Sequence, residues 1–297
     1  MKVLLFGKGG QVGWELQRAL APLGELTSLD FDSTDHHADF TRPAQLADTV
    51  RALRPDVIVN AAAHTAVDKA ESEPEFAATL NAEAPRVLAA EAAALGAWLV
   101  HYSTDYVFDG SGNAPRGEDA PTGPLSVYGR TKLDGENHIR ASGCAHLILR
   151  TSWVYAARGG NFARTMLKLA AEREALSVID DQFGAPTGAE LLADVTAHAI
   201  RACRADAKLS GTYHAVAAGE TSWFDYARLV IEWARARGLS VKVAADAIRA
   251  VPTSAYPTAA RRPLNSRLDT RKLRHAFGLE LPHWQAGVMR MLTEAFT

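Results

Sequence analysis

Residues 2–13 read Lys-Val-Leu-Leu-Phe-Gly-Lys-Gly-Gly-Gln-Val-Gly, an apolar run that passes directly into a glycine-rich turn. The run has the length and composition of a buried strand, and a partly apolar helical pattern follows the glycines. Glycine lets the backbone approach a pyrophosphate closely, and free N–H groups at a helix start favour an anion. A tight turn without ligand is the alternative. The stretch predicts dinucleotide contacts at Gly7, Gly10, Gln11, Val12 and Gly13.

Strands and helices alternate along the first half of the chain. Further strands are expected at 26–30, 57–60, 98–103 and 146–153, with helices at 42–53, 75–95 and up to about 142. Parallel strands need crossover connections, so this order predicts an α/β fold with a doubly wound parallel sheet, a Rossmann domain. In the second half of the chain the turn residues are irregularly spaced, which predicts a smaller mixed α/β domain that binds the substrate.

The two predicted domains are discontinuous in sequence. Residues 176–179 look like one more strand of the parallel sheet, although they follow the point where the regular alternation ends. The Rossmann domain is therefore expected to comprise residues 1–150 plus about 174–200. The substrate domain is expected to comprise about 151–173 and 201–297.

Composition and charge narrow the class of protein. The 297 residues are 47% hydrophobic and 22% charged, and the formal net charge is -2, which gives no bulk attraction to nucleic acid or to an anionic membrane. No apolar stretch approaches the roughly eighteen residues that span a bilayer. The two cysteines lack a Cys-x-x-Cys spacing, and no signal peptide precedes the first strand, so a cytoplasmic location is expected.

Tyr128 and Lys132 stand four residues apart in an expected helix and therefore share one face. An ammonium beside a phenol favours the ionised phenol, so Lys132 is expected to lower the tyrosine pKa from its usual value of about 10. General acid and base catalysis is most efficient when the pKa approaches the working pH. The pair predicts a nucleotide-dependent redox enzyme, because it accompanies a dinucleotide turn.

Other polar residues stand at predicted strand ends, where open α/β sheets bind ligands. Asp30 is placed to bind the adenosine ribose and favours NADH, whereas Lys8 suits a 2′-phosphate, so both coenzymes are expected to work. Asp39 and Phe40 are candidates for the adenine end, with simple packing of Phe40 as the alternative. Small residues after strand 57–60 let the backbone pass close to a cofactor and suggest further coenzyme contacts, with the start of an alanine-rich helix as the alternative. These are Ala62, Ala63, His64 and Thr65.

The strand at 98–103 ends in a run of hydroxyl side chains, Tyr102-Ser103-Thr104. Thr104 is expected to hydrogen-bond a substrate carbonyl that Tyr128 protonates, with Ser103 as the rival for that role. Tyr102 is expected to lie near the coenzyme. The sequence contains no nucleophile elbow, and Asp105 and Asp109 do not have the spacing of metal ligands, so a hydrolase is not supported.

The chain resembles the extended short-chain dehydrogenase/reductase family, and within it the dTDP-4-dehydrorhamnose reductases. The resemblance runs almost from end to end, and the blocks after the glycine turn are more specific than the turn itself. The matching blocks are 7–16, 60–71, Ser-Thr-Asp-Tyr-Val-Phe at 103–108, Tyr-Gly-Arg-Thr-Lys at 128–132, Arg-Thr-Ser-Trp-Val-Tyr at 150–155, and Asp-Gln-Phe-Gly-Ala-Pro-Thr at 181–187.

The resemblance implies reduction of the C4 keto group of dTDP-4-dehydro-β-L-rhamnose by NADPH or NADH. This is the last step in making dTDP-β-L-rhamnose, a donor for cell-surface polymers such as the lipopolysaccharide O-antigen. It implies Tyr128 as the acid, with Lys132 and Thr104 assisting. Implied sugar contacts are Asp105, Tyr106 and Trp153.

Two further groups are implied by the resemblance. Arg261 and Arg262 match family positions, and paired guanidinium groups suit a diphosphate, although a solvated basic loop is the alternative. Some family members form homodimers with Mg²⁺ at the interface, and the matching carboxylates here are Glu15, Glu190 and Glu294. Surface glutamates without metal are the alternative.

Three other functions remain open from the sequence. The same fold serves as a non-catalytic regulatory subunit of methionine adenosyltransferase, but the intact Tyr128 and Lys132 argue against that role. A reductase of another nucleotide 4-keto sugar differs only in the nucleotide that fits. An epimerase would retain its coenzyme through turnover.

Overall fold

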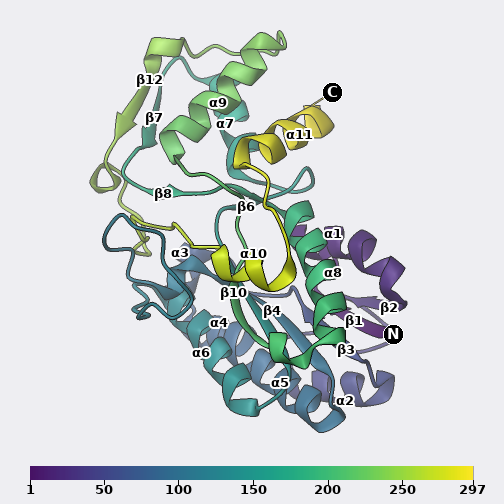
Figure 1. The fold of residues 1–297 in the computed structure, drawn as a ribbon. Coiled ribbons are helices and arrows are strands. Elements are labelled where there is room, and N and C mark those ends of the chain that lie inside the picture. Colours follow the sequence, from purple (N-terminus) through teal and green to yellow (C-terminus); the bar gives the residue numbers. More distant parts are fainter. Residues whose placement is uncertain (297) are drawn as a thin grey trace.

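The computed structural model describes residues 1–296 and centres on a parallel sheet of six strands (Figure 1). The strand order is β10-β5-β4-β3-β1-β2. Each pair in this sheet is parallel. The strands are β1 Lys2–Phe6, β2 Glu25–Leu29, β3 Val57–Asn60, β4 Trp98–Thr104, β5 His146–Thr151 and β10 Gly211–His214. The predicted α/β fold with a parallel sheet is confirmed.

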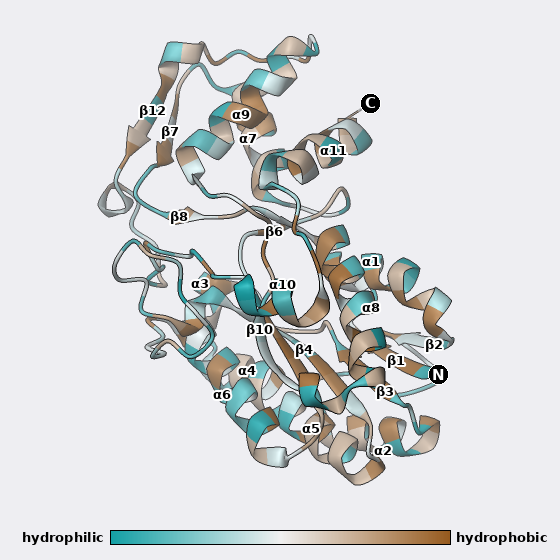
Figure 2. Ribbon diagram, viewed as in Figure 1, coloured by the Kyte–Doolittle hydropathy of each residue, from teal (hydrophilic) through white to brown (hydrophobic). Residues whose placement is uncertain are grey.

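Helices cover both faces of this sheet, which explains why its central strands are apolar throughout. Along β1, Val3 and Leu5 join the core under one layer of helices, whereas Leu4 and Phe6 join the core under the other. The first layer is α1 Gln11–Leu20 and α8 Ala189–Ala205, and the second is α2 Pro43–Leu53, α5 Ala84–Leu95 and α6 Val127–Ser142. Figure 2 shows the hydrophobic strands enclosed by helices whose outer faces are polar.

The helix expected at 75–95 forms in three consecutive pieces. These are α4 Pro74–Ala78, a π-helical turn at Thr79–Glu83, and α5, which ends at the left-handed Gly96. A short helix, α3 Val67–Ala70, precedes them. Helix α6 begins at the N-cap Ser126, whose hydroxyl accepts a hydrogen bond from the Gly129 N–H. These helices form the wall of the site described below.

A second group of elements lies beyond the carboxyl ends of the strands (Figure 1). Its core joins Tyr226, Val230, Trp284 and Val288. Its helices are α7 Phe162–Glu172, α9 Trp223–Ala236 and α11 Trp284–Phe296, and α10 Arg271–Phe277 lies nearer the sheet. Three two-stranded sheets complete it: β6 Val154–Tyr155 with β9 Thr187–Gly188, β7 Leu176–Ile179 with β12 Ile248–Val251, and β8 Phe183–Gly184 with β11 Thr221–Ser222.

The expectation that residues 176–179 continue the parallel sheet is wrong, because this strand, β7, pairs with β12 instead. Its Leu176 and Val178 are buried while Ser177 is exposed, so only one face is covered, unlike a central parallel strand. The sixth strand of the main sheet is β10, whose Gly211 and Thr212 give a weak strand signal. The predicted domain boundaries remain a prediction, and these pairings favour counting β10 with the parallel sheet.

No helix within residues 1–296 is long and apolar enough to cross a membrane.

Candidate active site

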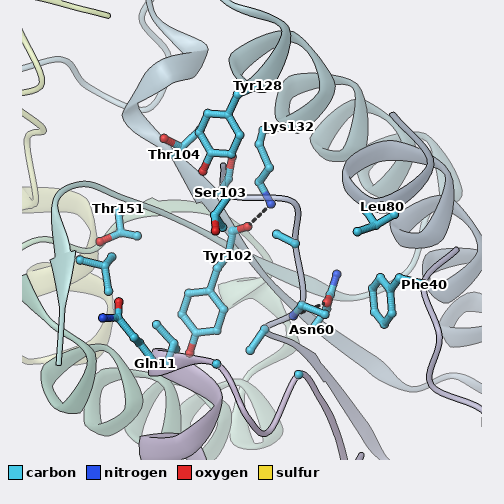
Figure 3. Close-up of a pocket in the computed structure, with 18 of the residues that line it drawn as sticks. Gln11, Phe40, Asn60, Leu80, Tyr102, Ser103, Thr104, Tyr128, Lys132 and Thr151 are labelled. Carbon is cyan, nitrogen blue, oxygen red and sulfur yellow. Dashed lines mark hydrogen bonds between the residues drawn. The ribbon is translucent and has the colours of Figure 1, made fainter. Parts of the chain in front are cut away.

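A cavity of about 890 Å³ opens at the carboxyl ends of β1, β3, β4 and β5 (Figure 3). It runs from the glycine turn to the start of α6 and reaches the second group of elements at Trp153 and Trp223. Most of the predicted site residues line it. They are Gly7, Gly10, Gln11, Val12, Asp30, Asp39, Phe40, Ala62, Ala63, Thr65, Tyr102, Thr104, Asp105, Tyr106, Tyr128, Lys132 and Trp153.

Four of the predicted coenzyme and substrate contacts lie outside the lining of this cavity. A side chain at Gly13 would overlap the Gly7 carbonyl, so Gly13 serves the contact between helix and turn. His64 is buried, and its ring lies 2.8 Å from a Glu73 carboxylate oxygen. Arg262 lines a neighbouring cavity, whereas Arg261 is exposed and lines neither.

The glycine turn fits closely against the loop after β3. Gly7 has a φ of +85°, and a Cβ there would lie 2.7 Å from the Ala62 nitrogen. The Gly9 N–H donates to Asp30 Oδ2 at 2.7 Å, which fixes the end of β2 to the turn. The glycines of the turn therefore let its backbone face the space that a pyrophosphate needs.

Two aromatic side chains stand at the Asp30 end of the cavity. Phe40 is buried and its ring packs edge-on against Phe6 with centroids 5.6 Å apart, so the packing alternative accounts for much of its role. Phe31 is 74% exposed and lines the same cavity. An exposed ring beside Asp30, the acid predicted to bind the ribose, suits stacking on a base. The sequence prediction missed Phe31, although its position next to Asp30 was the available signal.

The two hydroxyls that competed for the substrate have different partners. Ser103 donates to a Glu136 carboxylate oxygen at 2.6 Å and is thereby directed into the protein. Thr104 Oγ1 lies 3.1 Å from Asp105 Oδ1, and its hydrogen bond with the Tyr128 hydroxyl lowers the tyrosine pKa. Figure 3 shows Thr104 and Tyr128 side by side. The geometry favours Thr104 as the hydroxyl that meets a substrate.

A pair of substitutions separates the two hydroxyls. Thr104→Val is expected to lower kcat by about 10²-fold, the scale of one lost donor to a developing oxyanion. Ser103→Ala is expected to change kcat much less but to lower the melting temperature, because Glu136 loses a buried donor. Steady-state kinetics and thermal unfolding of both variants provide the check. Equal losses of kcat would contradict the assignment.

The expectation that Lys132 lowers the Tyr128 pKa is wrong for this structure. Burial raises the pKa of Tyr128 to about 12, the Thr104 hydrogen bond opposes this, and the Asp105 charge adds to it. Lys132 instead donates to the Tyr102 carbonyl at 2.6 Å (Figure 3). At neutral pH Tyr128 is therefore a protonated phenol, which is the form that can give a proton to a ketone oxygen.

Two other ionisable groups of the site have shifted pKa values. Burial lowers the pKa of Lys132 to about 8, although the Glu136 carboxylate partly opposes this. Burial raises the pKa of Asp105 to about 6, against hydrogen bonds with Ser266 and Thr104. Asp105 Oδ2 is buried and has no hydrogen-bond partner within residues 1–296, so one acceptor of a residue that lines the cavity is unused. Such buried polar atoms usually have partners, and a substrate hydroxyl suits this one.

A second cavity of about 340 Å³ adjoins the first and shares Tyr106, Trp153 and Trp223 with it. The indoles of Trp153 and Trp223 stack with centroids 3.6 Å apart. Trp153 has a φ of +51°, a strained backbone that is commonest at functional sites. Arg262 lies in the wall and donates to Asp68 at 2.6 Å. Aromatic rings beside a guanidinium suit a nucleoside diphosphate.

Asn81, in the π-helical turn, is a residue that the sequence prediction missed. It is fully buried, accepts from the His64 N–H at 2.9 Å, and donates to Thr131 of α6 at 3.1 Å. It therefore joins the loop after β3, residues 61–66 (the coenzyme-side loop), to the helix that carries Tyr128. π-helical turns are frequent at functional sites, but a single buried Asn within an alanine-rich helix gives no sequence signal.

Glu15, Glu190 and Glu294 line a third cavity of about 380 Å³, together with Arg290. Burial raises the pKa of Glu190, and the charges of Glu15 and Glu294 act in the same direction. Within residues 1–296, however, no three His, Cys, Asp or Glu side chains lie close enough together to hold a metal ion. The structure thus brings the predicted ligands to one cavity without forming a closed site.

The dinucleotide turn, the protonated phenol and the buried lysine at the strand ends define an α/β oxidoreductase of the short-chain type. The model of the family described as RmlD substrate binding domain matches residues 1–296, and the chain belongs to this family.

Named relatives extend over the whole chain. The chain is 61% identical to a dTDP-4-dehydrorhamnose reductase of Escherichia coli (strain K12), over 100% of this chain and 99% of the relative. It is 49% identical to one from Burkholderia thailandensis, over 97% of each. A solved dTDP-4-dehydrorhamnose reductase from Bacillus anthracis, in complex with NADP, is similar with a TM-score of 0.87 and 34% identity, covering 99% of this chain and 100% of that one. The predicted resemblance is confirmed.

Proposed function

We propose that this protein reduces the C4 keto group of dTDP-4-dehydro-β-L-rhamnose to give dTDP-β-L-rhamnose, using NADPH or NADH. The observation that carries the proposal is the placement of Tyr128 beside Thr104 in a cavity that also contains the dinucleotide turn. The relatives that match over the full chain are named as enzymes of this activity. The product would be the donor of rhamnose for cell-surface polymers.

Each side chain has a role that follows from its position. A nicotinamide coenzyme supplies a hydride when it is bound, and this chain would hold it through the glycine turn, Asp30 and Lys132. Tyr128 gives its proton to the C4 oxygen, and Thr104 hydrogen-bonds the same oxygen as negative charge develops there. Reduction of a ketone needs one hydride and one proton, so these groups balance the reaction.

We propose that both coenzymes are accepted. Asp30 Oδ2 already accepts from the Gly9 N–H and Oδ1 accepts from the Phe31 N–H, yet each carboxylate oxygen keeps a free lone pair for a ribose hydroxyl. The negative charge of Asp30 disfavours a 2′-phosphate, whereas Lys8 in the turn favours it. These opposite charges leave the coenzyme preference small.

The second cavity supports a nucleotide-linked substrate. Its tryptophan pair and Arg262 lie next to Tyr106, which also lines the first cavity, so a base and diphosphate could extend away from a sugar at Tyr128. An oxidoreductase of a free sugar would not need this extension. A reductase of another nucleotide 4-keto sugar remains the second candidate, since thymine is not distinguished from uracil by rings alone.

The proposed activity is tested by absorbance at 340 nm with purified protein, either coenzyme, and freshly generated dTDP-4-dehydro-β-L-rhamnose. Oxidation that depends on the sugar supports the reductase, and the ratio of the two rates ranks NADPH and NADH. Substitution of a UDP-linked 4-keto sugar tests the second candidate. An epimerase would leave the absorbance unchanged while converting the sugar, and a regulatory subunit would leave both the absorbance and the sugar unchanged.

We also propose that the protein forms a homodimer with Mg²⁺ at Glu15, Glu190 and Glu294. Carboxylate oxygens are the ligands that Mg²⁺ prefers. Burial raises the pKa of Glu190, and the charges of Glu15 and Glu294 add to this against the opposing charge of Arg290. Because these groups form no closed cluster in one copy, a second copy would complete the site.

Sedimentation velocity with and without Mg²⁺ tests this assembly. We expect Glu190→Gln to weaken the dimer in Mg²⁺ and to leave the dissociation in EDTA unchanged, because it removes one anionic ligand. Glu174→Gln, an exposed change on the loop before β7, is the matched control. A monomer under all conditions, or a dimer indifferent to Mg²⁺, would contradict the proposal.

We place the reaction in the cytoplasm. Both cysteines, Cys144 and Cys203, are buried and unpaired, which suits a reducing compartment. Nicotinamide coenzymes and nucleotide sugars are consumed by the proposed reaction and must be available there.

A further inference from the structure

Lys132 makes a second contact that the proposed mechanism does not use. Its Nζ lies 3.2 Å from Nε2 of His101, a histidine on β4 that faces away from the substrate cavity. The other ring nitrogen, Nδ1, lies 3.0 Å from the side-chain nitrogen of Asn60 on β3. Asn60 and His101 are register partners in the sheet, and Asn60, His101 and Lys132 are almost completely buried. Water therefore cannot replace any of the hydrogen-bond partners among these three side chains.

The orientation of the Asn60 amide follows from its neighbours. Asn60 Oδ1 accepts from the Ala62 N–H at 3.0 Å, and Ala62 lies in the coenzyme-side loop. Rotating the amide by 180° would set its NH₂ group against that backbone N–H, donor against donor. Nδ2 must therefore face His101, and because Nδ2 is only a donor, Nδ1 of His101 must be an acceptor.

This fixes the tautomer of the histidine. A neutral imidazole whose Nδ1 accepts carries its proton on Nε2, the nitrogen that faces Lys132. Burial, reinforced by the charge of Lys132, keeps the pKa of His101 well below its ordinary value, so the ring is neutral. A neutral lysine accepts from Nε2–H and donates to the Tyr102 carbonyl. A charged lysine has only donors and meets a donor at His101.

The other charged groups around Lys132 act in a known direction. Glu136, one turn further along α6, favours the charged lysine. Its carboxylate is bonded to Arg150 of β5 at 2.7 Å and to Arg140 of α6 at 3.0 Å, so its field is largely neutralised. Tyr128, on the same face of α6, is uncharged at neutral pH. His101 is thus the neighbour whose effect on the charge state of Lys132 is not offset by any of these other groups.

We infer that Asn60 and His101 form a positioning relay, in which the coenzyme-side loop sets the histidine tautomer and the histidine controls whether Lys132 carries a proton. The inference rests on the proposed function, since it concerns the lysine of the reductase site. It assigns positioning roles to two residues, of which Asn60 lines the first cavity and His101 does not. Movement of the Ala62 N–H on coenzyme binding would release the amide and so favour the charged lysine.

The test measures the protonation of Lys132 directly in the full-length protein without substrate. Lysine labelled with ¹³C at Cε is titrated by NMR, and Lys132→Arg identifies its signal by loss. Asn60→Asp leaves an acceptor for Ala62 and presents a second acceptor to Nδ1, which moves the imidazole proton to Nδ1. His101→Gln removes the ring and keeps an amide. His146→Gln, a partly buried histidine on β5 that bonds the Cys144 carbonyl, is the matched control.

The titration midpoint of Lys132 is expected to rise by about one pH unit, a tenfold change in protonation, in Asn60→Asp and in His101→Gln but not in His146→Gln. In turnover, the alkaline limb of the pH profile should move by the same amount. Unchanged midpoints in both relay variants would overturn the inference, and so would an equal rise in the control. The two proposals can fail separately. If the Lys132 midpoints behave as predicted but the parent protein shows no sugar-dependent oxidation of coenzyme, the proposed function fails while the relay stands.

Discussion

Tyr128→Phe is expected to lower kcat by about 10³-fold while coenzyme affinity stays within about twofold, which is the scale of a lost general acid. The substitution removes only the hydroxyl that shares a hydrogen bond with Thr104. The phenyl ring keeps the edge-on packing on Tyr106, where the centroids are 5.4 Å apart. Steady-state kinetics and a coenzyme titration by fluorescence measure the two quantities separately.

The matched control for this change is Tyr226→Phe. Tyr226 is buried in the core of the second group of elements, and its hydroxyl has no hydrogen-bond partner within residues 1–296. Removing that hydroxyl should leave kcat unchanged. Near-normal turnover in Tyr128→Phe would exclude Tyr128 as the proton donor, and a comparable loss in Tyr226→Phe would point to a general effect of removing buried hydroxyls.

Arg150→Leu is expected to destabilise the protein by about 3–5 kcal/mol, the range for removing one partner of a buried ion pair. Arg150 and Glu136 are both buried and joined by two hydrogen bonds of 2.8 and 2.7 Å. Glu136 also accepts from Ser103, next to Thr104. Urea unfolding at pH 7 measures the loss, and Arg140→Leu, which removes a far more exposed partner of the same carboxylate, should cost under about 1 kcal/mol.

The pH dependence of this loss has a defined sign. Burial alone would raise the Glu136 pKa, but hydrogen bonds and charge from Arg150 outweigh it and hold the pKa below the ordinary value. In the parent this stabilisation is present above the unfolded pKa of about 4.3 and is lost as pH falls through the lower folded value. In Arg150→Leu burial dominates and raises that pKa, so the cost should shrink between pH 7 and pH 5. A cost that is equal at both pH values would contradict this account.

The elements that local sequence predicts well are those whose signals lie within a few residues. The strand Lys2–Phe6 and the end of the alanine-rich helix at residue 95 were expected, because apolar periodicity and helix-stop signals are local. Membership of a sheet is not local. The apolar residues of β7 show that a strand forms there, but they cannot show that its partner, β12, lies about seventy residues later.

In the candidate site, too, features carried by local motifs were predicted, whereas features that depend on distant elements were not. Residues that carry motifs, such as Tyr128 and Thr104, were predicted from spacing and resemblance. The direction of the Tyr128 pKa shift was not, because burial depends on which elements cover the phenol. Asn81 and His101 were missed since each acts through partners on other elements, 50 and 31 residues away.

The most direct test of the central claim is the fate of deuterium from a nicotinamide coenzyme labelled at C4 of the reduced ring. The label is followed by NMR after incubation with purified protein and dTDP-4-dehydro-β-L-rhamnose. The account predicts dTDP-β-L-rhamnose with one deuterium on C4 of the sugar and stoichiometric oxidation of the coenzyme. Conversion of the sugar without deuterium at C4, or no sugar-dependent oxidation by protein that binds the coenzyme, would contradict it.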